Sequence, residues 1–282
     1  MDFFRGLFGS KEARRILSSL LDRGDFWRTF LFVGLDGVGK FLFAERFAMS
    51  ILCEGDERPC FKCRMCLSYK SGMNPFIKVV EPERDKISIS QVRDIISFVH
   101  VRSSRGKIVI IREAESMTPS ASNAFLKTLE EIPERTCFIL IASSPDALLP
   151  TVRSRCFVVR FSALSMDEMK KLLEAEGFHL DEEEFQVLYY LSGGSVGLMK
   201  DFLERDMYRL VEKVYYGIKR KDMDILTSIF LGEKDIVKKV LDGVLSYMIM
   251  KEDEEMDKVI KAYEFLERGV KSDKVAKYLA EF

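Results

Sequence analysis

The pattern of hydrophobic and polar residues changes once along the chain, near residue 162. Before that point, short apolar runs alternate with amphipathic stretches. Two of the runs, KIVII at 107–111 and TCFILIA at 136–142, are almost entirely hydrophobic, which is typical of parallel strands covered on both faces. Strands that alternate with helices predict a doubly wound α/β domain.

The expected elements of this domain follow from the period of the pattern and from capping residues. The predicted strands are 29–33, 76–80, 107–111, 136–144 and 156–161, and the predicted helices are 10–22, 41–52, a helix within SISQVRDIISFVHV and 120–132. Ser10 and Ser90 are the residue type that caps helix N-termini, so we place the starts of the first and third helices there.

Beyond residue 162 only helical patterns remain. Gly177 and the pair Gly193–Gly194 separate three short amphipathic stretches, and apolar residues at helical spacing continue to the end, for example Ile236, Val240, Val244 and Tyr247. We therefore predict three domains: an α/β domain at 1–162, a small helical lid at 163–203 and a helical C-terminal domain at 204–282.

Composition and charge narrow the class of protein. The chain has 282 residues, of which 47% are hydrophobic, and a formal net charge of −1 at pH 7. A near-neutral chain is not expected to bind nucleic acid strongly alone, because phosphate neutralisation dominates that affinity. The apolar runs are shorter than the roughly 18 residues of a membrane span, and the N-terminal segment lacks a signal-peptide cleavage region, so we expect a cytoplasmic protein without membrane contacts.

The stretch FVGLDGVGKFLFAERF resembles a phosphate-binding loop. Gly34, Gly37, Gly39 and Lys40 fit G-x-x-x-x-G-K between a predicted strand and a predicted helix, where backbone N–H groups and the lysine would cradle phosphate. A simple glycine-rich turn would explain neither the lysine nor the flanking elements. The next position should be Ser or Thr, whose hydroxyl holds Mg²⁺, but it is Phe41.

Two further positions of an ATPase site are changed. Arg112 stands after the strand KIVII, where an aspartate would hold Mg²⁺, and Glu113 follows it. Gly197 stands where an arginine of the lid would sense the nucleotide. An apolar and a cationic residue at the metal position predict a site that does not bind ATP and Mg²⁺ productively. The sequence leaves open whether the loop holds a nucleotide weakly, holds another anion or is filled by side chains.

Four cysteines lie close together with the spacing C-x6-C-x2-C-x2-C: Cys53, Cys60, Cys63 and Cys66. In a cytosolic chain this spacing favours a structural Zn²⁺ site with four thiolates; four free thiols or a redox pair are the alternatives. Nearby basic residues can offset the thiolate charge or contact DNA or another subunit; they are Arg58, Lys62, Arg64 and Lys70. Cys137 lies in an apolar run and is expected in the core.

Several stretches together resemble one family. GLDGVGK, the cysteine cluster, SISQVRDI, SNAFLKTLEEIPERTCFILIASS and LLPTVRSRCFVVRF lie between about residues 24 and 200, and they are similar to the delta-prime subunits of the bacterial DNA polymerase III clamp loader, which are AAA+ proteins. The resemblance implies a P-loop (AAA+ or RecA-like) parallel-sheet domain with a zinc-binding insertion, a helical lid and an all-α collar that mediates oligomerisation. Residues 204–282 match only in position and helical character.

The resemblance also implies a function in DNA replication. Such subunits form a hetero-pentameric ring with ATPase subunits and a delta-like subunit, which loads the sliding clamp onto primed DNA as part of the DNA polymerase III holoenzyme. Each ATP site lies between two neighbours, and one neighbour supplies an arginine finger from a Ser-Arg-Cys motif. Here the motif is Ser154, Arg155 and Cys156, so Arg155 is the predicted finger and its neighbours are expected to position the turn. Arg153 is the second candidate, and a surface arginine paired with a carboxylate is the alternative reading of Arg155.

The sequence is also compatible with two other functions. The chain could be an active AAA+ clamp-loader ATPase with Glu113 as base, in which case Lys40→Ala would abolish ATP turnover. It could instead be a zinc-dependent nucleic-acid-binding module on an α/β scaffold, which would require tight, salt-sensitive DNA binding by the isolated chain. We expect a subunit that is inactive alone and completes the ATP site of a neighbour.

Overall fold

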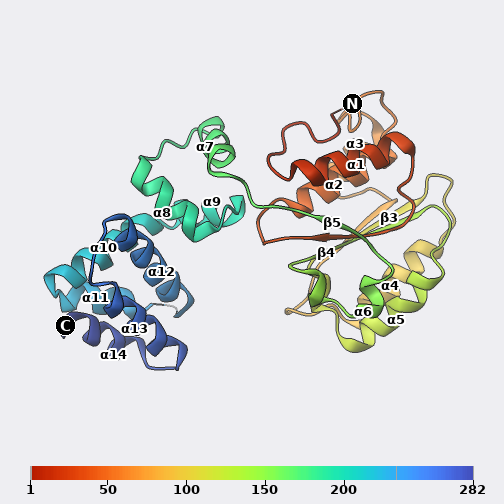
Figure 1. The fold of residues 1–282 in the computed structure, drawn as a ribbon. Helices are drawn as coiled ribbons and strands as arrows, with labels where there is room; N and C mark the ends of the chain where they lie inside the picture. The colour runs from red at the N-terminus through yellow and green to blue at the C-terminus, as the bar shows by residue number, and fades with distance from the viewer. Residues whose placement is uncertain (1, 233, 282) are drawn as a thin grey trace. The chain divides into compact units, whose positions relative to one another are not determined.

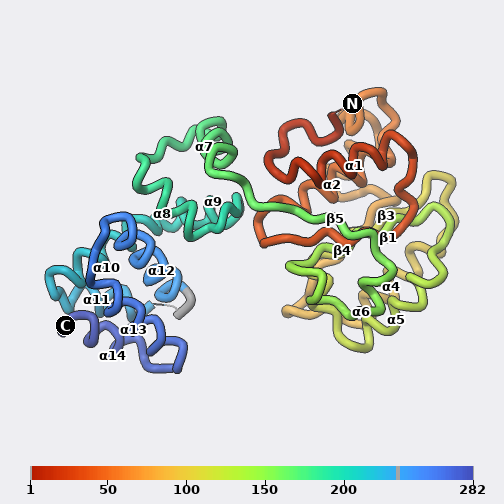
Figure 2. The backbone as a smooth tube through the Cα atoms, viewed as in Figure 1, coloured from red at the N-terminus to blue at the C-terminus, as the bar shows by residue number. Residues whose placement is uncertain are grey.

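A computed structural model describes residues 2–232 and 234–281 and shows two compact units, Met1–Leu164 and Ser165–Phe282. A single segment after the last strand leads from the first unit into the second (Figure 2). The predicted boundary after residue 162 lies two residues from the one observed. The further division of the helical part into a lid and a collar stays a prediction.

The first unit is built on a parallel sheet of five strands in the order β2-β3-β4-β1-β5. The strands are β1 (Thr29–Val33), β2 (Ile77–Val80), β3 (Lys107–Ile111), β4 (Thr136–Ala142) and β5 (Phe157–Arg160). β1 and β3 flank β4 and are buried along their whole length. The predicted doubly wound α/β fold is therefore confirmed.

Helices cover both faces of this sheet (Figure 1). One face carries α1 (Lys11–Arg23), α2 (Lys40–Leu52) and α3 (Arg64–Lys70), and the other carries α4 (Ile89–His100), α5 (Pro119–Glu130) and α6 (Pro150–Arg153). Successive side chains of a strand point to opposite faces. Phe30 and Phe32 of β1 thus enter the core under α1 and α2, while Leu31 and Val33 enter the core under α4 and α5. This double burial explains the continuous apolar runs of the sequence.

The two predicted helix caps differ in outcome: Ser10 occupies the N-cap position of α1, whereas Ser90 does not cap α4. Ser10 precedes α1 but has a left-handed backbone and makes no capping bond; its hydroxyl donates to the carbonyl of Ser162 at 3.2 Å. Helix α4 is capped by Ser88 instead of Ser90, because Ser88 and Gln91 form a reciprocal capping box. Helix α3, inside the cysteine-rich insertion, and the short α6 lie outside the predicted elements.

The second unit is helical, as predicted. Its helices are α7 (Met166–Ala175), α8 (Glu182–Ser192), α9 (Val196–Glu204), α10 (Met207–Arg220), α11 (Met223–Phe230), α12 (Lys234–Met250), α13 (Met256–Glu267) and α14 (Ser272–Glu281). α12 packs against α8, α10 and α13, and α11 packs against α14. Val240, Val244 and Tyr247 of the predicted apolar stripe are fully buried on α12. Within the described residues, no helix combines the length and apolarity that a bilayer span requires.

Candidate functional site

The predicted phosphate loop joins β1 to α2 at the carboxyl edge of the sheet. Gly34 lies so close to Phe161, the residue after β5, that a Cβ there would stand 2.4 Å from its carbonyl oxygen, which only glycine avoids. Gly37 and Gly39 have positive φ values of 74° and 90°, a region that glycine enters without steric cost. The glycines predicted from the motif therefore occupy positions that need glycine.

Lys40, the first residue of α2, is folded back into this loop. Its side chain is only 6% exposed. The ammonium donates hydrogen bonds to the carbonyl of Gly34, to the carbonyl of Leu35 at 2.8 Å and to a carboxylate oxygen of Asp36 at 3.2 Å. An ammonium has three N–H donors, so the loop itself satisfies all of them, and a bound phosphate would have to replace some of these contacts.

Phe41 and Arg112, the two residues at the predicted metal position, touch each other. The Arg112 guanidinium carbon lies 4.6 Å from the centroid of the Phe41 ring, within the range of a cation–π contact. Arg112 also forms an ion pair with Glu81 at 2.6 Å, and its backbone N–H donates to the carbonyl of Val80 at 2.9 Å. The position beside the phosphate loop is thus filled by an aromatic ring and a cation.

The two carboxylates that follow β3, Glu113 and Glu115, point in different directions. Glu113, the candidate base, is exposed and has a left-handed backbone at φ 47°. Glu115 turns inward instead, and one of its carboxylate oxygens accepts a hydrogen bond from the N–H of Ser143, after β4, at 2.9 Å. Its other oxygen is buried without a partner among the described residues. Sequence reasoning missed Glu115, because nothing in its local pattern distinguishes it from Glu113.

Arg155 lies on the surface after α6 and is held by its own chain. One terminal nitrogen (Nη2) forms an ion pair with Glu130 at 2.8 Å, and the other (Nη1) donates to the carbonyl of Thr151 at 3.0 Å. Its side chain is 37% exposed. Arg153 forms an ion pair with Asp146. The pairing of arginine with a carboxylate, considered above as the alternative, thus exists in the isolated chain.

The neighbours of Arg155 bond to the same short helix. Ser154 donates to the carbonyl of Thr151 at 3.1 Å, and the thiol of Cys156 lies 3.2 Å from the carbonyl of Val152. Burial raises the pKa of Cys156 to about 12, so its thiol is neutral at physiological pH. These contacts agree with a role for Ser154 and Cys156 in shaping the turn, which stays a prediction.

The four predicted zinc ligands come together. The Sγ atoms of Cys53, Cys60, Cys63 and Cys66 all lie within 4.8 Å of one another, close to the spacing expected around a tetrahedral ion with Zn–S bonds of about 2.3 Å. Backbone N–H groups of Gly55 and Cys60 point at the Cys53 sulfur at 3.4 and 3.3 Å. Such N–H···S contacts orient the ligands of a metal. The cluster can therefore hold one metal ion, and its chemistry fits zinc.

The pKa values of the cluster thiols and the basic side chains near them also suit a bound metal ion. Burial opposes a charge on Cys63, but hydrogen bonds from backbone N–H groups and neighbouring thiols outweigh it and lower its pKa to about 6. Burial raises the pKa of Cys66, so that thiol loses its proton only when a metal replaces it. Arg46 and Lys70 lie 4.3 and 5.0 Å from the ring centroid of Phe61, beside the cluster.

Asn74 ties this insertion to the sheet. It is 9% exposed. Its amide donates to the carbonyl of Met65 on α3, and its oxygen accepts from the N–H groups of Phe76 and Ile77, where β2 begins. Sequence reasoning missed this residue, although a buried asparagine is uncommon and usually fully hydrogen-bonded.

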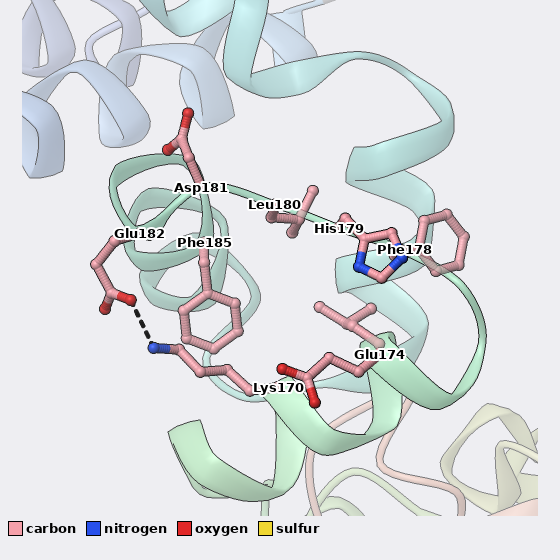
Figure 3. Close-up of a pocket in the computed structure, with 9 residues that line it drawn as sticks. Lys170, Glu174, Phe178, His179, Leu180, Asp181, Glu182 and Phe185 are labelled. Atoms are coloured by element: carbon pink, nitrogen blue, oxygen red, sulfur yellow. Dashed lines mark hydrogen bonds and ion pairs between the residues drawn. The ribbon is translucent and has the colours of Figure 1, made fainter.

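The second unit contains a hollow of about 210 Å³ between α7 and α8. Figure 3 shows Lys170 bonded to Glu182 at its rim, beside the ring of Phe185. The Lys170 ammonium is thus paired, and none of the predicted site residues line this hollow.

Comparisons with known proteins agree with this arrangement. A sequence profile of the family described as DNA polymerase III, delta subunit, matches residues 9–165, which is more than half of the chain. The DNA polymerase III subunit delta' of Pseudomonas aeruginosa is 35% identical over 191 residues, which cover 63% of this chain and 56% of that protein. The chain thus spans little more than half the length of this relative.

Solved structures share the fold. A DNA polymerase III gamma subunit-related protein of Thermotoga maritima superposes with a TM-score of 0.53 at 18% identity, over 94% of this chain and 97% of that one. A variant of RuvB from the same organism gives 0.52 at 15% identity, over 99% and 91%. These similarities confirm the predicted AAA+-type fold. The profile match over more than half of its length shows that the chain belongs to the DNA polymerase III delta subunit family.

Proposed function

We propose that this chain is a clamp-loader subunit that does not hydrolyse ATP itself and that supplies Arg155 to the ATP site of a neighbouring subunit. The names of its relatives, which are DNA polymerase III subunits, support the assembly. In this proposal the chain works in a hetero-pentameric ring with ATPase subunits and a delta-like subunit, and meets primed DNA and the sliding clamp only within that complex.

The contact between Phe41 and Arg112 carries the proposal. Mg²⁺ needs an octahedron of oxygen ligands, and in P-loop ATPases the protein supplies a hydroxyl after the loop lysine and an acid after the second strand. This chain has a benzyl ring and a guanidinium at those positions, 4.6 Å apart. The first offers no ligand, and the second repels a divalent cation. The loop lysine, Lys40, is meanwhile bonded to its own loop.

Arg155 has the properties that a residue acting in trans requires. Its guanidinium is partly exposed and anchored on two elements of the first unit, α5 and α6. A guanidinium delivered by a neighbour stabilises charge on the transferring phosphoryl group and accelerates phosphoryl transfer by about 10³ to 10⁵. A subunit without an active site of its own can therefore still control hydrolysis in the next one.

Reconstitution with the other clamp-loader subunits of the same organism tests the proposal. We expect the wild-type chain to co-purify with them, and we expect Arg155→Ala to leave assembly intact while it removes hydrolysis at the one site that this chain completes. Arg153→Ala, a neighbouring and equally ion-paired arginine, is the matched control and should leave the rate unchanged. A complex whose ATPase rate is insensitive to Arg155→Ala would contradict the assignment.

A further inference from the structure

We propose that Glu130 is a positioning residue that holds the guanidinium of Arg155 in the orientation in which it meets a neighbour's phosphate. This inference rests on the proposed function, because it concerns the regulation of the same site. Glu130 is the last residue of α5, and Arg155 follows α6, 25 positions later. The two residues are brought together only by the fold.

The contacts fix one edge of the guanidinium and leave the other free. Nη2 bonds to Glu130 at 2.8 Å, and Nη1 bonds to the carbonyl of Thr151 at 3.0 Å and to the hydroxyl of Ser154 at 3.5 Å. A guanidinium has five N–H donors in a rigid plane. Among the described residues, no partner binds the Nε–H of Arg155, so donors remain for an incoming anion while the plane is held.

Glu130 is poorly explained by stability alone. A carboxylate at the C-terminus of a helix is opposed by the helix dipole. Its side chain is 54% exposed, and exposed ion pairs contribute little to folding. The helix that carries it is, in contrast, firmly fixed, since Phe125 and Leu129 of α5 are buried against the sheet. A carboxylate on a rigid helix end is suited to orienting a long side chain such as that of Arg155.

The expected gain is one of preorganisation. Ordering a long side chain at an interface costs the equivalent of about 2- to 10-fold in rate or affinity. Because Glu130 already orders Arg155 in the free subunit, this loss does not arise when the neighbour binds. The opposite arrangement, in which Glu130 withholds Arg155 from the neighbour, predicts a faster enzyme when Glu130 is removed. Whether Glu130→Ala lowers or raises the ATPase rate therefore distinguishes positioning of Arg155 from withholding of Arg155.

The test measures the ATPase rate of the reconstituted complex. The relevant part of this rate is the difference between the wild-type complex and the Arg155→Ala complex. We expect Glu130→Ala to lower this part about 2- to 10-fold through kcat, with KM for ATP unchanged. Glu130→Gln, whose amide oxygen still accepts a hydrogen bond, should recover most of it. Glu131→Ala, the exposed neighbour at the end of the same helix, is the matched control and should have no effect.

A double variant shows whether Glu130 acts through Arg155. If it does, Glu130→Ala should add no loss on top of Arg155→Ala, whereas an additive loss would overturn the inference. An unchanged or increased rate in Glu130→Ala would overturn it as well. Because the proposed function depends on Arg155→Ala alone, a complex that responds to that change but not to Glu130→Ala would contradict only the positioning role.

Discussion

Replacing both residues at the metal position should return a metal site to the phosphate loop. In the double variant Phe41→Thr with Arg112→Asp, a hydroxyl and a carboxylate stand where P-loop ATPases carry their Mg²⁺ ligands. We expect this variant to bind nucleotide in a Mg²⁺-dependent manner that the wild-type chain lacks. The variant loses the contact of Arg112 with Phe41 and with Glu81, so its melting temperature must be measured beside its affinity.

The distance between the two residues sets the size of the effect. A Mg²⁺ ion at the place of the Phe41 ring would lie about as far from the guanidinium of Arg112 as the ring centroid does, 4.6 Å. Coulomb repulsion at that distance is roughly 7 kcal/mol at an effective dielectric constant of about 20 and roughly 2 kcal/mol in water. The Arg112 side chain is 39% exposed and paired with Glu81, so the lower value applies. Removing the cation alone should thus strengthen Mg²⁺-dependent binding about 30-fold.

Calorimetric titration with ADP, with and without Mg²⁺, measures the Mg²⁺-dependent gain in nucleotide affinity directly. Lys40→Ala in the background of the double variant should abolish the new binding, since the lysine supplies the phosphate contact. Arg153→Asp makes the same charge change at an arginine of equal exposure, 39%, that precedes β5, and should leave the affinity unchanged. A folded double variant with no Mg²⁺-dependent gain would refute the reasoning.

Three other outcomes follow from the structure. Zinc analysis should give about one ion per chain, and Cys66→Ser should abolish it and unfold the insertion, since such binding contributes on the order of 10 kcal/mol; metal-free, fully folded wild-type protein would contradict the site. Burial opposes charge on Asp253, but hydrogen bonds from Lys219, the Glu255 N–H and Tyr215 outweigh it and hold its pKa below the usual value. Asp253→Asn should therefore lower the free energy of unfolding by about 1–3 kcal/mol at pH 7. In urea titrations the difference should shrink as the pH falls below about 4, where the unfolded carboxyl takes up its proton, and disappear below the lowered pKa of the folded protein. Gly34→Ala should cost on the order of 1–3 kcal/mol, because its Cβ would clash with Phe161; Gly72→Ala, at φ 72° instead of 152° and with nothing within 4 Å of its Cβ, reports in thermal melts the cost of a positive φ without a clash.

The sheet could be predicted because burial on both faces leaves a plain signal in the sequence. β3 and β4 are apolar at nearly every position, and both of their faces are covered. The cap of α4 was predicted at the wrong serine because several serines near a helix start compete, and three-dimensional partners decide among them. Ser88 caps the helix instead of Ser90 because Gln91 forms a reciprocal capping box with Ser88. Ser10 is drawn away by the carbonyl of Ser162, which is distant in sequence.

The sequence predicted which residues form the candidate site, but not which of them contact one another. The motif identifies Lys40, and the strand pattern places Arg112, yet the stacking of Arg112 on Phe41 joins the residue after β3 to the second residue of α2. The ion pair of Arg155 with Glu130 and the inward turn of Glu115 likewise depend on how α5, α6 and β4 are placed. Local sequence patterns identify such residues, but their contact partners depend on the tertiary structure.

Steady-state ATP hydrolysis by the purified chain, with Lys40→Ala beside it, tests the central claim most directly. With Phe41 and Arg112 in the metal position, the account predicts that both proteins give the same background rate and that added Mg²⁺ changes neither. A Mg²⁺-dependent rate in the wild-type chain that disappears in Lys40→Ala would contradict it.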